Sequence, residues 1–324
     1  MRIIQYKNIL IALGLAAMLV SAGLVFKYGL NLGIDFTGGA LTEVVYETQP
    51  EKAELESNLS SMELGDYSLR VTTDETGRAG YILRSRDLSE PERVQVQEVL
   101  TAAGQGGEIT RFTSIGPVIG QELKDKAVWA IGGVVAIIVL YVAFAFAGVG
   151  KPVGSWVYSF ITIFVLVHDV LVPSALMSLL GKFAGIEVDV LFVMALLAVL
   201  GYSVNDTIVV FDRVRENLIK YRQEKKKVRR DEFGQKHEEI DYTFDKPFSE
   251  IVGISVSETL LRSFNTSFTT FLALVALYFF GGDVTKTFAL VLIAGVVAGT
   301  YSSIFLASPL LVWYASWQEK KQSR

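Results

Sequence analysis

Six segments of this chain are each long and apolar enough to cross a lipid bilayer, which takes roughly 20 residues of helix. The mean hydropathy of the 324-residue chain, +0.40, is high for a soluble protein. Inside a bilayer every backbone N–H and C=O group must find a partner within the protein, so each segment is expected to be a helix. We predict a polytopic α-helical membrane protein with six transmembrane helices, at residues 8–26, 128–148, 156–180, 190–211, 264–280 and 288–314.

The basic residues predict how the chain is oriented. They gather before the first segment, after the second, after the fourth and after the sixth, and all these positions lie on one side of the membrane if the chain crosses it six times. Loops rich in Lys and Arg stay in the cytoplasm. We therefore expect both termini on the cytoplasmic side. The residues behind this assignment are Arg2, Lys7, Lys151, Arg213, Arg215, Lys220, Arg222, Lys225, Lys226, Lys227, Arg229, Arg230, Lys320, Lys321 and Arg324.

The orientation divides the chain into six parts. We interpret the first segment as an uncleaved anchor, because its apolar run is longer than the ~7–15 residues typical of a signal peptide. The predicted parts are the N-terminal end with the first helix (1–26), an extracytoplasmic domain (27–126), helices two to four (127–212), a basic cytoplasmic loop with an amphipathic helix (213–262), helices five and six (263–315) and a cytoplasmic tail (316–324).

The extracytoplasmic segment has the pattern of a small α+β domain. ALTEVVYE alternates apolar and polar residues as a half-buried strand does, and the helical stretch EKAELESNLSSM follows it. Two strand-like runs, YSLRVTT and GYILRS, are joined by the turn-like DETGRA. A second helix has Ser89 as its expected N-cap and Pro91 in its first turn, and the run GEITRFTSI closes the domain. The order βαββαβ predicts a ferredoxin-like domain.

The end of the basic loop predicts an amphipathic helix. Apolar and small residues recur at helical spacing from Phe248 to Val256, with Glu250 and Glu258 on the other side. One interpretation is a helix that lies along the membrane surface. The equally weighted alternative is a linker helix packed on the transmembrane helices.

Asp169 lies near the middle of the third apolar segment, where a charge costs at least ~2.5 kcal/mol, so such residues usually face the interior of the bundle. We favour a place on an ion path over a purely structural role for Asp169, and the reverse for His168. His168 is next in sequence and about 100° round the helix. We therefore expect that the two side chains do not face one point.

Asp206 lies about 9 Å inside the expected end of its helix, a depth from which its short side chain does not reach water easily. It needs a partner, and Arg262, which opens the fifth segment at a similar depth, is the predicted one. A polar stripe continues from Arg262 through Asn265, Thr266 and Thr269 on one helical face. In an otherwise apolar segment this face must meet protein or water.

The sixth segment carries two rows of small residues with a spacing of four, a pattern that lets helices touch. The rows are Gly295, Gly299 and Ser303, and Ala294, Ala298 and Ser302.

Motifs typical of enzymes are missing. There are no cysteines, which excludes disulfides and thiol chemistry, and GIDFTGG lacks the Lys-Ser/Thr of a phosphate loop. No nucleophile elbow or H-E-x-x-H zinc motif is present either. We expect a protein that is not an enzyme, with no cofactor, no metal site and no nucleic-acid partner.

Several motifs together resemble the SecF family of bacterial protein-export subunits, and the resemblance covers nearly the whole chain. The motifs are GLNLGIDFTGGALTEV (29–44), TSIGPVIGQEL (113–123), VHDV (167–170), GYSVNDTIVVFDRVREN (201–217), LRSFNTSFTT (261–270) and AGTYSSIFLASPLL (298–311). The resemblance implies half of an RND-type transporter, completed by SecD in the bacterial cytoplasmic membrane. It also implies that protons, the coupling ion, flow along their gradient and help to draw preproteins through SecYEG after SecA has started them. YajC, YidC and membrane lipids are further implied partners.

In the family pattern Asp206 and Arg262 match the carboxylate and arginine on which proton transport depends, Asn205 lies beside them, and Asp169 matches the His-Asp position of the third helix. Protonation of Asp206 is expected to weaken its pairing with Arg262 and let the helices repack against SecD. Two alternatives are an RND-type exporter of small molecules or lipids and a scaffold that transports nothing. Sodium is the alternative coupling ion.

Overall fold

The computed structural model describes residues 2–74, 76–147, 152–230 and 236–322, so Lys151, Arg324 and residues 231–235 of the predicted basic loop lie outside it. In this part of the chain six helices are long and apolar enough to cross a membrane, which confirms the predicted number. They are α2 (Lys7–Tyr28), α6 (Pro117–Ala145), α7 (Ser155–Ala184), α8 (Val190–Lys220), α9 (Phe248–Phe280) and a sixth formed by α10 (Asp283–Ser302), the π-helical turn η1 (Ser303–Ala307) and α11 (Ser308–Gln322). A short helix, α1 (Arg2–Gln5), precedes them.

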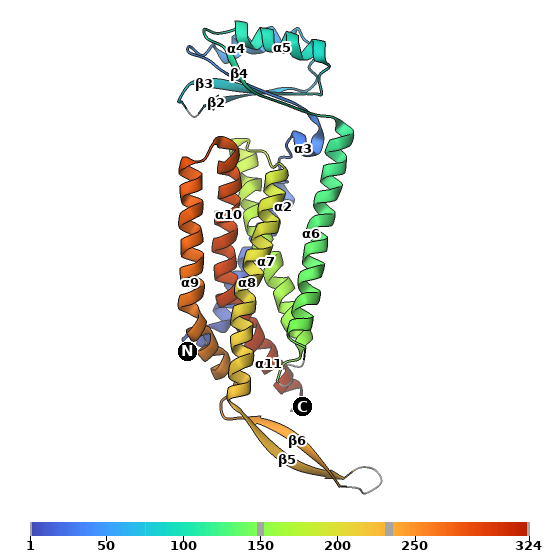
Figure 1. The fold of residues 1–324 in the computed structure, drawn as a ribbon, viewed down its shortest axis with the longest axis vertical. Coiled ribbons are helices and arrows are strands. Elements are labelled where there is room, and N and C mark those ends of the chain that lie inside the picture. Colours follow the sequence, from blue (N-terminus) through green and yellow to red (C-terminus); the bar gives the residue numbers. More distant parts are fainter. Residues whose placement is uncertain (1, 75, 148–151, 231–235, 323–324) are drawn as a thin grey trace.

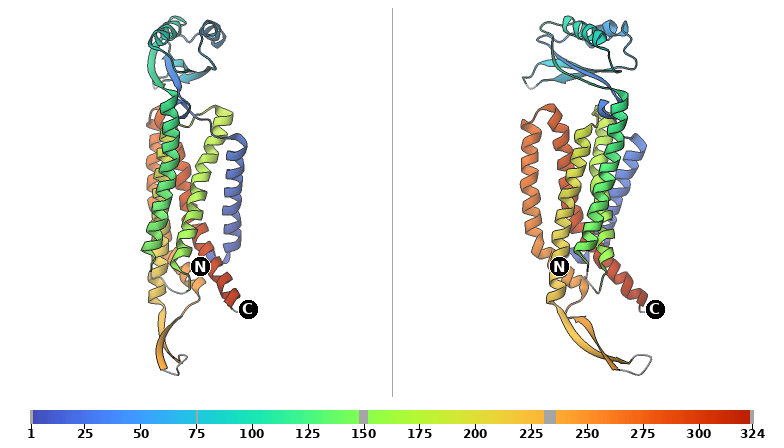
Figure 2. Two further views of the ribbon diagram at one scale, coloured as in Figure 1. Left: turned by 90° about the vertical axis from the view of Figure 1, so that its right-hand side faces the viewer. Right: turned by 45° about the vertical axis from the view of Figure 1, so that its right-hand side comes forward.

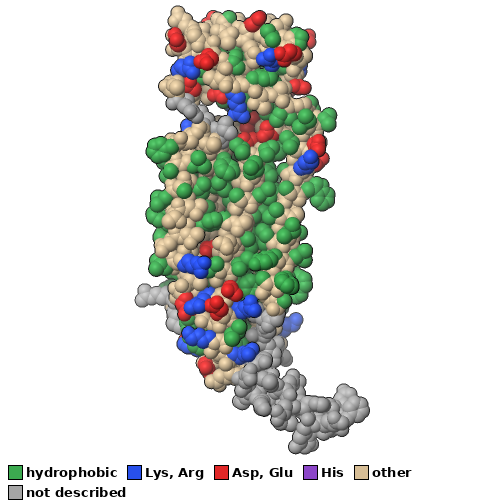
Figure 3. All heavy atoms as spheres, viewed as in Figure 1, with side chains coloured by type: hydrophobic (Ala, Val, Ile, Leu, Met, Phe, Trp, Pro, Cys, Tyr) green, Lys and Arg blue, Asp and Glu red, His purple; other side chains and the backbone are tan. Residues whose placement is uncertain are grey.

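The helices form one elongated bundle with a small domain at one end and a β-hairpin at the other (Figure 1). We refer to these ends as the domain side and the hairpin side; both termini lie on the hairpin side. Hydrophobic side chains cover the middle of the bundle, and charged side chains gather towards its two ends (Figure 3). Within the bundle α10 packs on three helices, α7, α8 and α9, and α2 packs on the outer side of α7 (Figure 2).

Several helices run beyond the predicted spans. α8 continues past residue 211 to Lys220, because Val214 and Leu218 keep an apolar face that packs on the start of α9. α9 begins at Phe248, and its first turns carry Ile251 and Val252, both fully buried in the same cluster. Two alternatives were open for the predicted amphipathic helix, a helix along the membrane surface and a linker helix packed on the transmembrane helices. The structure shows the packed helix, since its apolar residues are covered by other helices. Apolar content alone marks only the membrane-facing part of such helices.

The domain on the domain side has the predicted element order. Its sheet is antiparallel, in the order β2-β3-β1-β4, and helices α4 and α5 cover one face of it (Figure 1). Leu55 and Leu59 from α4 meet Val96 and Leu100 from α5 over this face and are completely buried. The elements are α3 (Ile34–Thr37), β1 (Gly39–Val45), α4 (Lys52–Ser60), β2 (Ser68–Thr73), β3 (Ala79–Ser85), α5 (Glu90–Ala102) and β4 (Glu108–Ile115).

Ser89 is the N-cap of α5 as predicted, and its backbone N–H donates to Oε2 of Glu92 at 2.8 Å in a capping box. The sequence did not predict the hairpin of β5 (Arg222–Arg230) and β6 (Lys236–Phe244), which extends the polar end of the bundle (Figure 1). Strands this rich in charge carry little of the apolar alternation by which strands are found.

Candidate functional site

Asp169 is fully buried in the middle of α7, where three neighbouring side chains donate hydrogen bonds to it or share one with it. Its Oδ2 accepts from Ser302 Oγ at 2.7 Å and from Ser203 Oγ, and its Oδ1 lies 2.8 Å from His168 Nδ1. Hydroxyl and imidazole donors offset much of the cost of burying a carboxylate. These contacts tie three helices, α7, α8 and α10, to a single side chain.

The expectation that His168 and Asp169 face different points is wrong. The His168 ring reaches the carboxylate of the next residue, although their Cα atoms are about 100° apart round the axis. Side-chain torsions, which helical periodicity does not predict, close this distance. The other ring nitrogen, Nε2, is buried and has no hydrogen-bond partner among the described residues.

Asp206 lies on α8 one turn beyond Ser203 and is partly buried. Its Oδ2 accepts a hydrogen bond from Ser303 Oγ at 2.7 Å. Ser302 and Ser303 are consecutive, so adjacent serines bind the two intramembrane carboxylates, Ser302 on Asp169 and Ser303 on Asp206. The helix changes here from α10 to the π-turn η1, a feature that is frequent at functional sites.

Ser302 and Ser303 were not predicted as partners of the acids. They were predicted only as members of the rows of small residues for helix packing. One feature of the sequence could have indicated their role. Both rows end in a hydroxyl residue instead of Gly or Ala, and the two intramembrane carboxylates need hydrogen-bond donors.

The rows of small residues do bring α10 close to α8, as predicted. A Cβ atom added to Gly295 would lie 2.1 Å from Cγ2 of Val199, and one added to Gly299 would lie 3.2 Å from Cβ of Ser203. Real Cβ atoms essentially never approach another atom to 2.1 Å. The glycines therefore set the distance at which Ser203 and Ser302 reach Asp169 from two sides.

Arg262 does not pair with Asp206 in this structure, so the predicted direct ion pair is wrong for the described residues. Asp206 turns towards α10 and Ser303, whereas Arg262 is exposed on α9 and lines a polar cavity of about 260 Å³ near the hairpin side. Asp212, Glu216 and Glu258 line the same cavity. Helical spacing predicted the polar face of α9, but not the rotation of α8 that directs Asp206 to Ser303.

The remaining predicted polar residues face outwards. Asn205, Asn265, Thr266 and Thr269 are all exposed on the surface of this single chain. The hydroxyl groups of Thr266 and Thr269 donate to carbonyls of their own helix, Arg262 O at 3.0 Å and Thr266 O at 2.9 Å. The stripe on α9, defined by Arg262, Asn265, Thr266 and Thr269, is thus a polar face in an apolar helix with no cover from the described part of the chain.

A test of the Asp169 site is the removal of one of its donors. Ser302→Ala leaves a buried carboxylate short of a hydrogen bond, and we expect a loss of about 1–3 kcal/mol of stability. The measurement is the unfolding temperature of the purified protein. The matched control is Ser316→Ala, whose hydroxyl donates to the Val312 carbonyl of its own helix at 2.8 Å and accepts from Lys7 Nζ at 3.3 Å, and therefore binds no buried carboxylate among the described residues. Equal unfolding temperatures for the two variants would show that Asp169 does not depend on Ser302.

Comparisons with known proteins agree on one family. The family model for the C-terminal part of the protein export membrane proteins SecD and SecF matches residues 95–232 and 233–317, and the model for the SecD/SecF GG motif matches residues 23–50. The protein translocase subunit SecF of Thermobaculum terrenum is 37% identical, with 94% of this chain and 91% of the relative covered. SecF of Pseudomonas aeruginosa is 34% identical, over 95% of this chain and 89% of the relative.

Two solved structures of SecDF also match. The crystal structure of SecDF, a translocon-associated membrane protein, from Thermus thermophilus superposes with a TM-score of 0.78 and 31% identity, and covers 97% of this chain. A crystal structure of SecDF in a super-membrane-facing form gives a TM-score of 0.65 and 30% identity, and covers 99% of this chain. This chain spans only 38% and 39% of those two longer chains.

Proposed function

This chain belongs to the SecD/SecF family of protein-export membrane proteins as a SecF-type, multi-pass subunit of the Sec machinery, and from this premise we propose that it couples proton flow to the late movement of preproteins. The proposed complex contains SecD and acts with the SecYEG channel after SecA has started translocation. YajC and YidC are further proposed partners. The chain catalyses no covalent reaction in this scheme; its substrates are the proton and the preprotein.

The observation that carries the proposal is the arrangement of Asp169 and Asp206. Both acids lie inside the helix bundle, and both are bound by hydroxyl groups of α8, α10 and η1, with His168 beside Asp169. A hydroxyl group can donate to a carboxylate and accept from a carboxylic acid, so the site remains hydrogen-bonded in both protonation states. A site held by a strong ion pair would favour only the charged state.

The proposed cycle changes the charge on Asp206. When Asp206 is charged, its carboxylate accepts the Ser303 hydrogen bond that holds α8 against η1. When a proton neutralises it, this charge-assisted hydrogen bond weakens and α8 is free to repack against η1. Asn205 and the stripe on α9 (Arg262, Asn265, Thr266 and Thr269) supply polar groups along the path. Helix packing is the two-state element, and the proton is the ligand that biases it.

SecD is the proposed cover of the stripe on α9. A polar face of this kind inside a membrane has to meet protein or water, since lipid tails satisfy none of its groups. In the related Thermus thermophilus protein a SecF-like part and further sequence form one chain, SecDF, which supports a SecD subunit as the neighbour of this chain.

The interface with SecD can be tested by cross-linking, because the chain has no native cysteine. We expect that Thr269→Cys, on the exposed stripe of α9, forms disulfide cross-links with cysteines introduced into SecD. Ile137→Cys is the matched control, since Ile137 is 68% exposed on α6 and far from the stripe in sequence. SecD cross-links at position 137 and none at position 269 would contradict the proposed interface.

We propose the bacterial cytoplasmic membrane as the location, with the hairpin side and both termini in the cytoplasm. The supporting observation is that the basic residues at the ends of α8 and α11, Arg213, Arg215, Lys220, Lys320 and Lys321, lie on the hairpin side, as in cytoplasmic loops. The domain then lies outside the cytoplasm. We assign it to the ferredoxin-like class, since its βαββαβ order and the antiparallel strand order β2-β3-β1-β4 fit that class.

The test of the function uses inverted membrane vesicles that contain this chain and its SecD. After ATP-driven initiation by SecA, ATP is removed and the advance of a preprotein is followed with a proton gradient, a sodium gradient or neither. We expect advance with the proton gradient alone. Advance that is equal under all three conditions would indicate a scaffold, and uptake of small amphiphiles driven by the gradient would indicate an exporter.

A further inference from the structure

The short loop between α7 and α8, residues 185–189, joins the two helices that carry Asp169 and Asp206. It lies under the face of the domain's sheet that α4 and α5 leave uncovered (Figure 1). Any change in the packing of α7 against α8 has to move this loop. The contacts between the loop and the sheet therefore decide whether such a change reaches the domain.

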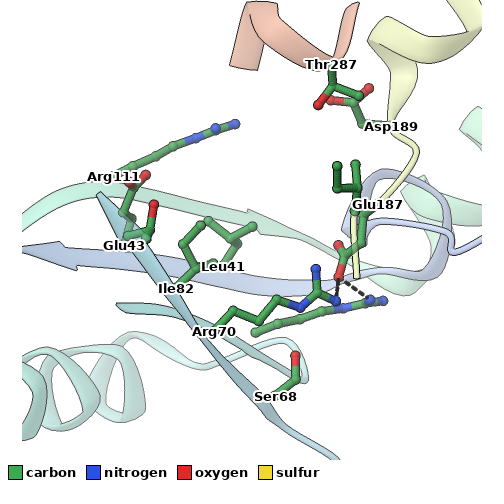
Figure 4. Close-up of a pocket in the computed structure, with 12 residues that line it drawn as sticks. Leu41, Glu43, Ser68, Arg70, Ile82, Arg111, Glu187, Asp189 and Thr287 are labelled. Atoms are coloured by element: carbon green, nitrogen blue, oxygen red, sulfur yellow. Dashed lines mark hydrogen bonds and ion pairs between the residues drawn. The ribbon is translucent and has the colours of Figure 1, made fainter. Parts of the chain in front are cut away.

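Glu187, in the middle of the loop, is bound by two arginines from adjacent strands (Figure 4). Its Oε1 lies 2.7 Å from Arg70 Nη2 on β2 and 3.0 Å from Arg84 Nη1 on β3. Arg70 Nη1 also donates to the Gly185 carbonyl, and Arg84 Nη2 donates to Thr37 Oγ1 at 2.7 Å. The glutamate side chain is only 16% exposed, so these pairs are partly screened from water.

The other side of the loop is fixed to the segment that leads from α2 into the domain. Val188 N donates to Asn31 O and Gly33 N donates to Val188 O, both at 2.8 Å. Asp35 accepts from Val190 N at 2.9 Å, at the first residue of α8. The loop is thus held between the sheet and the entry of the domain and cannot shift independently of both.

Apart from these contacts, the space between sheet and bundle is hollow, and most of the residues that line it are charged or polar. A cavity of about 220 Å³ lies there, lined by Leu41, Ser68, Arg70, Arg111, Glu187 and Thr287 among others (Figure 4). An interface of this kind differs from the domain's own core, where apolar side chains are packed without exposure. A small number of charged contacts across such a gap can separate and re-form. Separating a large apolar interface is less favourable, because it exposes apolar surface to water.

We propose that Glu187, together with Arg70 and Arg84, is the joint through which repacking of α7 and α8 is transmitted to the domain. Glu187 is a positioning residue in this scheme, since it touches neither the proton site nor the preprotein. The inference rests on the proposed function, because it names the mechanical output of the same proton site. It adds a third connection to the two places where the chain passes between bundle and domain, residues 27–39 and 114–127.

The first test of the joint measures the distance between the domain and the helix bundle. In the full chain with SecD, spin labels are placed at Gln95→Cys on α5 and Lys182→Cys at the end of α7, both exposed, and the chain offers no other cysteine. We expect a narrow distance distribution that broadens to longer distances in Glu187→Gln. Reversal of the charges with Glu187→Arg, Arg70→Glu and Arg84→Glu is expected to narrow it again. Glu54→Gln, which removes an exposed charge of α4, is the matched control and should leave it unchanged.

A distribution in Glu187→Gln that stays as narrow as that of the unchanged chain would overturn the joint. Gradient-driven advance of a preprotein in the same variant supplies the second readout. We expect this rate to fall towards the rate without a gradient, with SecA-driven initiation and SecD association unchanged. A normal rate with a released domain would also overturn the proposal, since Glu187 would then be only a tether. If Asp206→Asn shows normal advance, the proposed function fails, whereas the distances still report whether Glu187 holds the domain.

Discussion

Asp206→Asn is expected to abolish the part of preprotein movement that depends on the proton gradient. Asn has nearly the same shape as Asp and can still accept the hydrogen bond from Ser303, which is 2.7 Å long in this structure. It cannot gain or lose a proton, so the bundle loses the change of charge that biases its two packings. The measurement is the advance of a preprotein in inverted vesicles after ATP has been removed. We expect the rate of the variant to equal the rate without a gradient.

The matched control for this experiment is Asp212→Asn. Asp212 lies on the same helix, but its side chain is 54% exposed and its nearest basic partner, Arg215, is 3.9 Å away. We expect normal gradient-driven advance in the control and unchanged association with SecD in both variants. Loss of SecD association in Asp206→Asn, with normal advance per assembled complex, would assign Asp206 a structural role and make Asp169 the better candidate for the proton site.

The second large effect is expected at Gly295, where α10 packs closely on Val199 of α8. Gly295→Ala places a methyl group 2.1 Å from Val199 Cγ2, so the helices have to separate or Val199 has to move. Overpacking of this kind costs typically about 1–3 kcal/mol. The separation also draws Ser302 away from Asp169. We therefore expect a lower unfolding temperature, a smaller yield of complex with SecD and a slower gradient-driven advance.

Val199→Ala supplies the compensating change, because it removes the two methyl groups that the new side chain would meet. The double variant is expected to be more stable than the sum of the two single changes predicts. Gly132→Ala on α6 is the control, since an added Cβ there meets no atom within 4 Å and Ala favours the helix. Strict additivity of Gly295→Ala and Val199→Ala would show that the close approach of α8 and α10 does not limit stability.

The sequence predicted those features that depend on local pattern. Apolar length predicted six spans, alternating residues predicted the strands of the domain, and Ser89 followed by Pro91 marked the start of α5. Asp169 and Asp206 were found as candidates because charges in apolar segments are rare and costly. None of these inferences needs to know which helix is the neighbour of which.

The partners of the acids could not be predicted, because they depend on the rotation and spacing of whole helices. The depth of Asp206 in its helix shows that it needs a partner, but the packing of Gly295 on Val199 decides that Asp206 meets Ser303 and not Arg262. In the same way the sequence gives no sign of the role of Glu187, because only the packing of the sheet on the bundle brings Arg70 and Arg84 to it. Contacts between elements that are far apart in sequence carry no local signal.

Asp206 is proposed to gain and lose a proton as part of the cycle, and infrared spectroscopy measures this change directly. The complex of this chain with SecD is titrated in membranes, and the carbonyl stretch of protonated carboxyl groups is recorded for the unchanged chain and for Asp206→Asn. We expect a band that grows as the pH falls and is missing from the variant. Spectra that superimpose at every pH would show that Asp206 does not change its protonation and is not the proton site.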